Sequence, residues 1–206
     1  MATGTFWAPL LLVAIGLAGH LWADVRHHPV ARAALKAVAS SGFLLVAASH
    51  LSADRYAVLL AAGLVLSALG DMLMLGASRP AFLASVGAFL LAHLAYAAAF
   101  VPRSQPSLLV AIALLAAGVL VVRALWPHLG ELRVPVLVYA LAISAMLLLA
   151  LGVGQPLVRV GAALFYVSDL TVARDRFVAP GVANRVIGLP LYYAAQVLLA
   201  LSLGAA

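Results

Sequence analysis

The chain has 206 residues, of which 67% are hydrophobic and 9% are charged, and its mean hydropathy is +1.18. Water-soluble domains carry about 25% charged residues, so this composition excludes a soluble globular enzyme and a disordered protein and indicates an integral membrane protein. The net charge of +6 comes mostly from single arginines between apolar runs, which favours membrane anchoring over nucleic-acid binding.

Eight apolar runs are each long enough, at about 20 residues, to cross the hydrocarbon core of a membrane as a helix. In chain order they are 5–23, 33–50, 56–76, 80–101, 106–126, 133–152, 157–173 and 183–204. No basic segment precedes the first run and no cleavage site follows it, so we expect a retained helix rather than a signal peptide. The seventh run is the shortest and most polar, which leaves a re-entrant segment as the alternative. The predicted fold is an all-α polytopic membrane helix bundle with about eight transmembrane helices, in one transmembrane helical domain over residues 1–206.

Basic residues are unevenly shared between the two ends of this predicted bundle. The first, third, fifth and seventh connections, with the adjacent helix ends, hold Arg26, Arg32, Lys36, Arg79, Arg123, Arg133, Arg174, Arg176 and Arg185. The opposite end holds Arg55, Arg103 and Arg159. Because basic connections remain in the cytoplasm, this bias predicts that both termini lie on the outer side. The Ala/Leu/Arg-rich composition suggests a bacterial inner membrane.

Two acidic residues, Asp71 and Asp169, lie within apolar runs, whereas the sequence places the other four in connections: Asp24, Asp54, Glu131 and Asp175. A carboxylate near the centre of a membrane helix costs about 2.5–3.5 kcal/mol, so each buried acid is a functional-site hypothesis. Helix capping or interhelical packing is the alternative. Both acids lie about four or five residues from the basic end, roughly 7–8 Å for five residues. We therefore expect them to meet in a polar chamber that opens toward the cytoplasmic leaflet.

Helical spacing places further polar side chains on the same or matching helix faces. They are Lys36, Ser40, Ser67, His93, Tyr96, Tyr166, Arg185, Tyr192 and Gln196. For the tyrosines, an interfacial belt or simple packing is the more common role, whereas His93 lies mid-helix, where a belt does not explain it. Ser168 is next to Asp169, but adjacent residues on a helix face apart, so the pair does not indicate a serine nucleophile.

Several chemistries have little support in this sequence. The single lysine, Lys36, lies in an early helix, which disfavours a retinal-type Schiff base. The chain has no cysteine, no HExxH motif and no histidine pair four residues apart, which disfavours a zinc hydrolase. A metal site made by His93, Asp71 and Asp169 remains geometrically conceivable. Two carboxylates with a histidine and hydroxyls suit general acid–base chemistry on a membrane-derived substrate.

Two other functional classes stay open at this point. Paired membrane acids with a histidine also occur in proton-coupled transporters, although the small size and the absence of a detectable internal repeat disfavour that class. A non-catalytic lipid-binding membrane protein would use the two acids for stability alone.

Five segments of the sequence form a recognisable series: KAVASSG from Lys36, SALGDML from Ser67, GAFLLAHLAY from Gly87, FYVSD from Phe165 and YYAAQ from Tyr192. In this order they resemble the YhhN/TMEM86 family of lysoplasmalogenase-like membrane proteins. The resemblance covers residue 33 to the end and implies eight helices and an ether hydrolase. Such an enzyme cleaves the vinyl ether bond of lysoplasmalogens to a fatty aldehyde and glycerophospho-ethanolamine or -choline.

The resemblance carries the two aspartates of the family onto Asp71 and Asp169 and its histidine onto His93, which are the predicted catalytic residues. We expect Asp169 to be the acid and Asp71 to orient water, with the reverse assignment also open. The predicted substrate-binding residues are Lys36, Ser67, Tyr96, Tyr166, Ser168, Arg185, Tyr192 and Gln196, and Lys36, Arg185 and Arg174 are expected near the phosphate. No metal or organic cofactor is required. The expected partners are a lysophospholipid and the bilayer, without nucleic acid, and the oligomeric state stays open.

Overall fold

The computed structural model describes residues 4–205, so the outermost residues of the predicted 1–206 domain lie outside the described part. The long helices are α1 Gly4–Val25, α2 Pro29–Ala48, α3 Arg55–Leu73, α4 Arg79–Phe100, α5 Leu108–Leu125, α6 Arg133–Gly152, α7 Pro156–Ala173 and α8 Val182–Leu201. All eight are long and apolar enough to span a membrane. The predicted all-α bundle is therefore confirmed for residues 4–205, which contain no β-strand.

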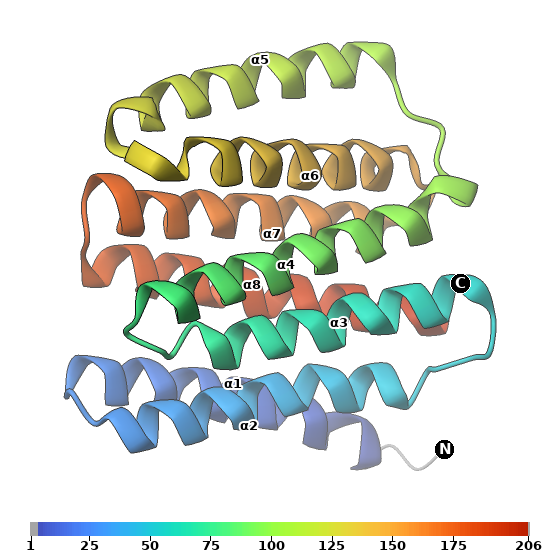
Figure 1. The fold of residues 1–206 in the computed structure, drawn as a ribbon. Helices are drawn as coiled ribbons and strands as arrows, with labels where there is room; N and C mark the ends of the chain where they lie inside the picture. The colour runs from blue at the N-terminus through green and yellow to red at the C-terminus, as the bar shows by residue number, and fades with distance from the viewer. Residues whose placement is uncertain (1–3, 206) are drawn as a thin grey trace.

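The seventh run forms a continuous helix and is not re-entrant in this structure. After Ala173 the chain continues as a π-helical turn, η4 Arg174–Val178, so the apolar helical segment extends from Pro156 to Val178. Short 3-10 turns flank other helices: η1 Val101–Arg103, η2 Trp126–His128, η3 Gly130–Leu132 and η5 Ser202–Ala205. Consecutive helices run in opposite directions along the bundle (Figure 1).

Local sequence explains where several helices begin. Proline has a fixed φ and no N–H, so it suits a first helical turn, and α2 begins at Pro29, four residues earlier than predicted. The Asp54 carboxylate accepts a 2.9 Å hydrogen bond from the Ala57 amide and caps α3. Hydrogen bonds from the Ser52 hydroxyl and from this amide lower the pKa of Asp54 below its ordinary value.

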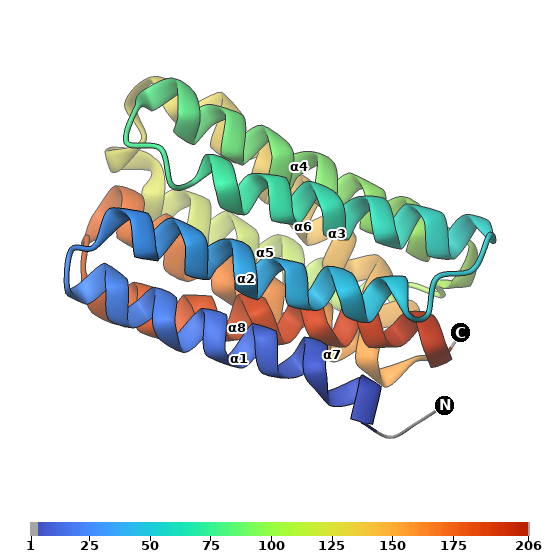
Figure 2. The same cartoon turned by 90° about the horizontal axis from the view of Figure 1, so that it is seen from below.

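Helix α8 lies near the middle of the bundle and α5 lies at its edge (Figures 1 and 2). Helix α8 packs against α1, α2, α3 and α7, whereas α5 packs mainly against α6. In α5, which is described over its full length, Leu125 is the single buried residue. Most of the α5 surface is therefore available to lipid.

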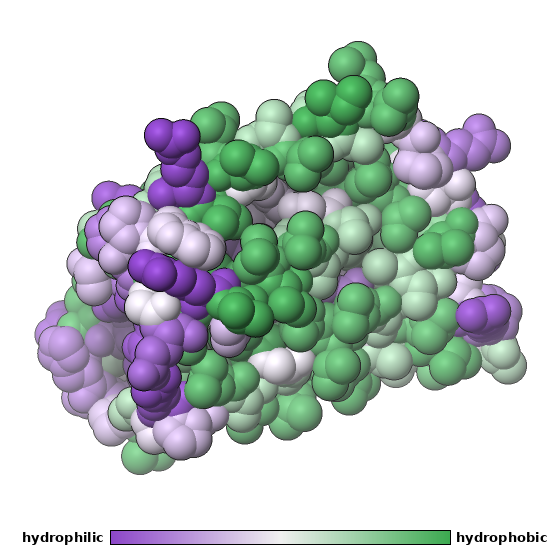
Figure 3. Space-filling model, turned by 45° about the horizontal axis from the view of Figure 1, so that its top comes forward, coloured by the Kyte–Doolittle hydropathy of each residue, from purple (hydrophilic) through white to green (hydrophobic). Residues whose placement is uncertain are grey.

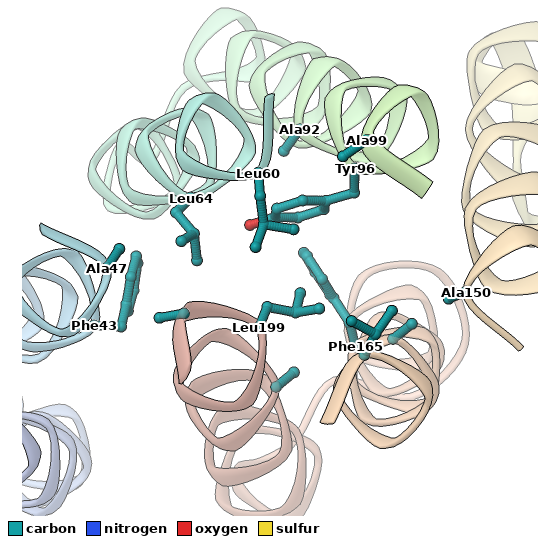
Figure 4. Close-up of a cluster of buried hydrophobic side chains, with 14 of the residues drawn as sticks. Phe43, Ala47, Leu60, Leu64, Ala92, Tyr96, Ala99, Ala150, Phe165 and Leu199 are labelled. Carbon is teal, nitrogen blue, oxygen red and sulfur yellow. The ribbon is translucent and has the colours of Figure 1, made fainter. Parts of the chain in front are cut away.

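Aromatic and aliphatic side chains from several helices form the core. Figure 4 shows Phe43, Leu60, Tyr96, Phe165 and Leu199 directed into the space between α2, α3, α4, α7 and α8. Tyr96 packs directly on α3 because residue 63 is a glycine, and a Cβ atom there would overlap the tyrosine ring. This close approach brings the Tyr96 hydroxyl among the buried polar groups.

The connections α1–α2, α3–α4, α5–α6 and α7–α8 lie at one end of the bundle, and the start of α1 and the end of η5 lie at the other (Figure 1). The first of these ends carries the nine basic residues named above, and we call it the basic end. Figure 3 shows hydrophilic side chains gathered at this end and an apolar band beside it. Charge and apolar surface are thus segregated along the helix axes, as expected for a protein that spans a membrane.

Candidate functional site

A cavity of about 600 Å³ opens at the basic end of the bundle and is lined by residues from all eight helices. One part of its wall is polar and comes from α1, α2 and α8, with His20, Asp24, Arg32, Lys36 and Arg185. The opposite part, from α4, α5 and α6, is apolar and includes Leu83, Val86, Val121, Val136 and Ile143. The cavity therefore suits a molecule with a charged head and a hydrocarbon chain.

Asp71 of α3 is held by donors from two other helices. Lys36 Nζ of α2 lies 3.0 Å from Asp71 Oδ1, and the side chains of the two residues are 6% and 3% exposed. The Ser40 hydroxyl donates to Asp71 Oδ2 over 2.7 Å, and the Tyr192 hydroxyl of α8 donates to the same atom over 2.8 Å. A carboxylate has about four acceptor positions, and these donors occupy three of them.

A chain of hydrogen bonds continues behind Asp71 into the core. The Tyr192 hydroxyl also lies 3.3 Å from the Ser67 carbonyl oxygen, and the Ser67 hydroxyl lies 3.3 Å from that of Tyr96. The Tyr96 hydroxyl donates to Gln196 Oε1 over 2.8 Å. Ser67, Tyr96 and Gln196 are buried and do not line the cavity. These three predicted binding residues thus support Asp71 and Tyr192 from behind and do not reach the cavity.

Asp169 of α7 has a different environment. The Tyr139 hydroxyl of α6 donates to Asp169 Oδ2 over 2.6 Å. Among residues 4–205, no hydrogen bond reaches Asp169 Oδ1. The Asp169 side chain is 17% exposed and lines the cavity, against 3% for Asp71. Asp169 is therefore the carboxyl group that a molecule in the cavity reaches more readily.

His93 of α4 lies behind Asp169. His93 Nδ1 lies 2.6 Å from the Phe89 carbonyl oxygen, which can only accept, so this nitrogen carries a proton. In the neutral ring Nε2 is then an acceptor, and it lies 3.6 Å from Asp169 Oδ2 without a hydrogen-bond partner among the described residues. His93 is buried and absent from the cavity wall. Any influence of His93 on a bound molecule must therefore pass through its cavity-lining neighbours, which are Asp169, Tyr139 and Phe89.

The two acids line one cavity, and an aromatic ring contacts a partner of each. The Phe165 ring has its centroid 4.6 Å from that of His93 and 5.5 Å from that of Tyr192. It therefore packs against both the histidine beside Asp169 and the tyrosine beside Asp71. Within residues 4–205, no group of three His, Cys, Asp or Glu side chains is placed to hold a metal ion, so His93, Asp71 and Asp169 do not form such a group.

An acid that the sequence places in a connection lies at the mouth of the cavity instead. Asp24 belongs to the last turn of α1, which ends at Val25. Its Oδ1 pairs with Arg32 over 3.2 Å and its Oδ2 with Arg185 over 2.7 Å. The placement of Asp24 in a connection was wrong, because the helix continues two residues beyond the predicted run. Asp24 joins the cationic side chains of α2 and α8.

The predicted site residues divide into two groups. Those on the cavity wall are Lys36, Asp71, Tyr166, Ser168, Asp169, Arg185 and Tyr192, and those behind it are Ser67, His93, Tyr96 and Gln196. The Ser168 hydroxyl donates to the Gly188 carbonyl oxygen over 2.9 Å and so joins α7 to α8. Arg174 does not line the cavity, since it donates to Asn184 over 2.6 Å, and Arg176 lines the mouth in its place.

Sequence reasoning missed Tyr139, Asp24 and Arg32 as parts of the site. Tyr139 lies in one of the most apolar runs, and a single hydroxyl there has no polar partner on its own helix face. Asp24 could have been found, because it follows His20 by four residues, which is one helical turn. Both residues line the cavity.

Comparison with known proteins identifies relatives of this chain. Residues 31–203 match the YhhN family. The chain is 37% identical over 155 residues to "Lysoplasmalogenase" of Mycobacterium bovis, a match that covers 66% of this chain and 56% of that protein. It is 36% identical to "Lysoplasmalogenase TMEM86A" of Bos taurus (78% of this chain, 68% of that one) and 37% identical to "Lysoplasmalogenase TMEM86B" of Homo sapiens (79% and 69%). No solved structure matches the chain.

Proposed function

Because the chain belongs to the YhhN family, we propose that it is a membrane hydrolase that cleaves the vinyl ether bond of lysoplasmalogens. The products are a fatty aldehyde and glycerophospho-ethanolamine or -choline. The observation that carries this proposal is that Asp71 and Asp169 line the same cavity, which has a cationic mouth and an apolar wall. Relatives named lysoplasmalogenase support the choice of reaction.

The cavity accommodates the parts of such a substrate in a defined order. The phosphate lies at the mouth near Arg32 and Arg185, and Arg32 Nε is buried without a hydrogen-bond partner among the described residues, so it is available as a donor. The hydrocarbon chain lies against the apolar side chains of α4, α5 and α6. The vinyl ether, which joins the two, then lies beside the two carboxyl groups.

Asp169 is the proposed general acid. A proton on its Oδ1 faces the cavity, because Oδ2 is occupied by the Tyr139 hydroxyl. Transfer of this proton to the vinyl carbon remote from the ether oxygen uses the π electrons to form a C–H bond. The product is an oxocarbenium ion, and Asp169 becomes a carboxylate that faces it.

Asp71 is the proposed base. It binds a water molecule on the side that lines the cavity, while Lys36, Ser40 and Tyr192 hold the carboxylate in place. The water oxygen bonds to the carbon that carries the ether oxygen, and the water proton passes to Asp71, giving a hemiacetal. In its collapse the hemiacetal hydroxyl returns a proton to Asp169, Asp71 protonates the glycerol oxygen, and the C–O bond breaks. Both acids regain their initial states.

The basic end is proposed to face the cytoplasm of a bacterial cell, with the protein in the inner membrane. The excess of arginine at that end supports this orientation. The chain has no cysteine, so single cysteines introduced by Ala77→Cys at the basic end and Ala53→Cys at the other end provide a test. In intact cells, a membrane-impermeant maleimide is expected to label the Ala53→Cys protein alone, and labelling of the Ala77→Cys protein alone would reverse the orientation.

The reaction is tested by aldehyde release from lysoplasmalogens with each head group, using purified protein in detergent, where no gradient exists. We expect release by the unaltered protein and a loss of about 100-fold or more in Asp71→Asn and Asp169→Asn. Asp54→Asn is the matched control, because it is the same substitution at the far end and asparagine also caps a helix. No release from either lipid by the folded, unaltered protein would overturn the proposal and favour transport or lipid binding.

A further inference from the structure

The packing between α5 and α6 contains a gap at two small residues. Gly118 of α5 and Ala140 of α6 line the main cavity and also a second hollow of about 490 Å³. A Cβ atom at Gly118 would find one atom within 4 Å, the Ser144 hydroxyl oxygen at 3.8 Å. Glycines such as Gly16 and Gly42 differ, because a Cβ atom there would overlap a neighbouring helix. Glycine at position 118 is thus not required for close packing of α5 against a neighbouring helix, and it leaves open space beside α5.

The second hollow lies along α5 and α6 and is lined mainly by apolar residues, among them Leu115, Val119 and Leu141. Its lining runs from Leu114 of α5 to Trp126, the first residue of η2, which is about 18 Å at 1.5 Å per residue. One leaflet of the hydrocarbon core is about 15 Å thick. The hollow therefore has the length of one lipid chain in one leaflet.

The outer surface of α5 borders the same hollow. Most large side chains of α5 are exposed, including Leu115, Val119 and Leu120, and in the bundle this helix lies at the edge (Figures 1 and 2). Figure 3 shows this apolar face of the molecule hollowed between green side chains. The second hollow therefore adjoins lipid-facing side chains of α5 and shares Gly118 and Ala140 with the main cavity.

We propose that the hydrocarbon chain of a single-chain phospholipid crosses between α5 and α6 over Gly118 and Ala140, with its far end in the second hollow. The identity of the bound molecule rests on the proposed function, and the basis of the passage is that Gly118 and Ala140 line both hollows. Residue 118 then determines chain-length selectivity, since a larger side chain closes the passage. A short chain, which ends before the passage, is unaffected.

The test uses Gly118→Ala, Gly118→Leu and Gly118→Phe, with Gly87→Leu of α4 as the matched control. Gly87 lines neither hollow, and a Cβ atom there meets nothing within 4 Å. The ligands are saturated alkyl lysophospholipids of short and long chain, which lack the vinyl group, so binding needs no hydrolysis. Trp126 lines the second hollow and reports the chain through quenching by bromine atoms near its end, after Trp7→Phe and Trp22→Phe remove the other two tryptophans.

We expect saturable quenching of Trp126 by the long brominated lipid, about tenfold weaker binding of long chains in Gly118→Leu, and short-chain binding unchanged within about twofold. The loss of long-chain binding should increase from Gly118→Ala to Gly118→Phe. Gly87→Leu should bind both chain lengths as the parent protein does. Equal losses for both chain lengths, or no loss in the folded Gly118 variants, would overturn the passage. If the passage is overturned in this way but the protein still releases aldehyde from lysoplasmalogens, the proposed function stays intact. Chain-selective quenching without aldehyde release would instead retain the passage and reject the reaction.

Discussion

The Tyr139 hydroxyl donates a 2.6 Å hydrogen bond to Oδ2 of Asp169 and thereby joins α6 to the helix that carries the proposed acid. Because Oδ2 accepts this hydrogen bond, Oδ1 is the carboxyl oxygen without a hydrogen-bond partner among the described residues. Nε2 of His93, which also has no hydrogen-bond partner among those residues, lies 3.6 Å from the same Oδ2 atom, and the His93 and Tyr139 rings contact each other with centroids 5.3 Å apart. Tyr139 and His93 thus approach the same oxygen of the proposed acid.

Removal of this hydroxyl in Tyr139→Phe is expected to lower kcat for aldehyde release about tenfold or more, because a hydrogen bond to a charged group contributes about 1.5–3 kcal/mol. KM should change little, since the hydroxyl contacts Asp169 and not the proposed phosphate site. Steady-state kinetics in detergent provide the measurement. Tyr56→Phe, which removes a tyrosine hydroxyl at the far end of the bundle, is the control for stability. An unchanged kcat in Tyr139→Phe would show that Asp169 needs no such partner.

The Lys36–Asp71 ion pair predicts non-additive effects on stability. Lys36→Met leaves the Asp71 carboxylate buried without its cation, and loss of one partner of a buried pair costs about 3–5 kcal/mol. The double variant Lys36→Met/Asp71→Asn removes both charges and is expected to lose less than Lys36→Met alone. Thermal unfolding in detergent compares the parent protein, Lys36→Met, Asp71→Asn and the double variant. Losses that add across the two sites would mean that the charges do not interact.

The cationic mouth predicts a binding effect at Arg185. Arg185→Gln should raise KM about tenfold with a smaller change in kcat, because the guanidinium contacts the proposed phosphate position and not the vinyl ether. Arg103→Gln at the opposite end of the bundle, where the guanidinium lies over the Tyr56 ring, should leave KM unchanged. A drop in kcat without any rise in KM for Arg185→Gln would place this residue outside phosphate binding.

The packing of Tyr96 on α3 predicts opposite results for two glycine substitutions. Gly63→Ala introduces a Cβ atom that overlaps the Tyr96 ring, and such overpacking costs about 1–3 kcal/mol. Gly87→Ala has open space around it and should be neutral or stabilising by up to about 1 kcal/mol, since alanine favours a helix over glycine. Unfolding temperatures of the two variants in one detergent test the difference. Equal shifts would contradict the close approach of α3 and α4.

The sequence was sufficient to predict the helices because a span of about 20 apolar residues has few alternatives in a membrane. Helical spacing also grouped Arg185 and Tyr192 on one face of a helix, and both line the cavity. Their interhelical partners did not follow from spacing within one helix. The Tyr192–Asp71 hydrogen bond joins residues 121 positions apart, and its existence depends on how α3 and α8 pack.

The aromatic surroundings of the two acids were also beyond the sequence. Their similar depth predicted a shared polar chamber, and both line one cavity, but the Phe165 ring that contacts a partner of each acid was not predicted. Depth along a helix follows from residue number, whereas rotation about the helix axis and the packing of aromatic rings depend on all neighbours together. Asp24 was missed for a simpler reason, since helix ends are uncertain by a few residues in any assignment from sequence.

Lys36 is the single lysine of the chain, and its ammonium lies 3.0 Å from Asp71 within the site. Amine-directed reagents such as succinimidyl esters therefore have one side-chain target in the folded protein, and that target is 6% exposed. Acylation at Lys36, read by peptide mass spectrometry, becomes a reporter of site opening that needs no engineered label. A lipid seated at the mouth should slow this modification, and unfolding should accelerate it.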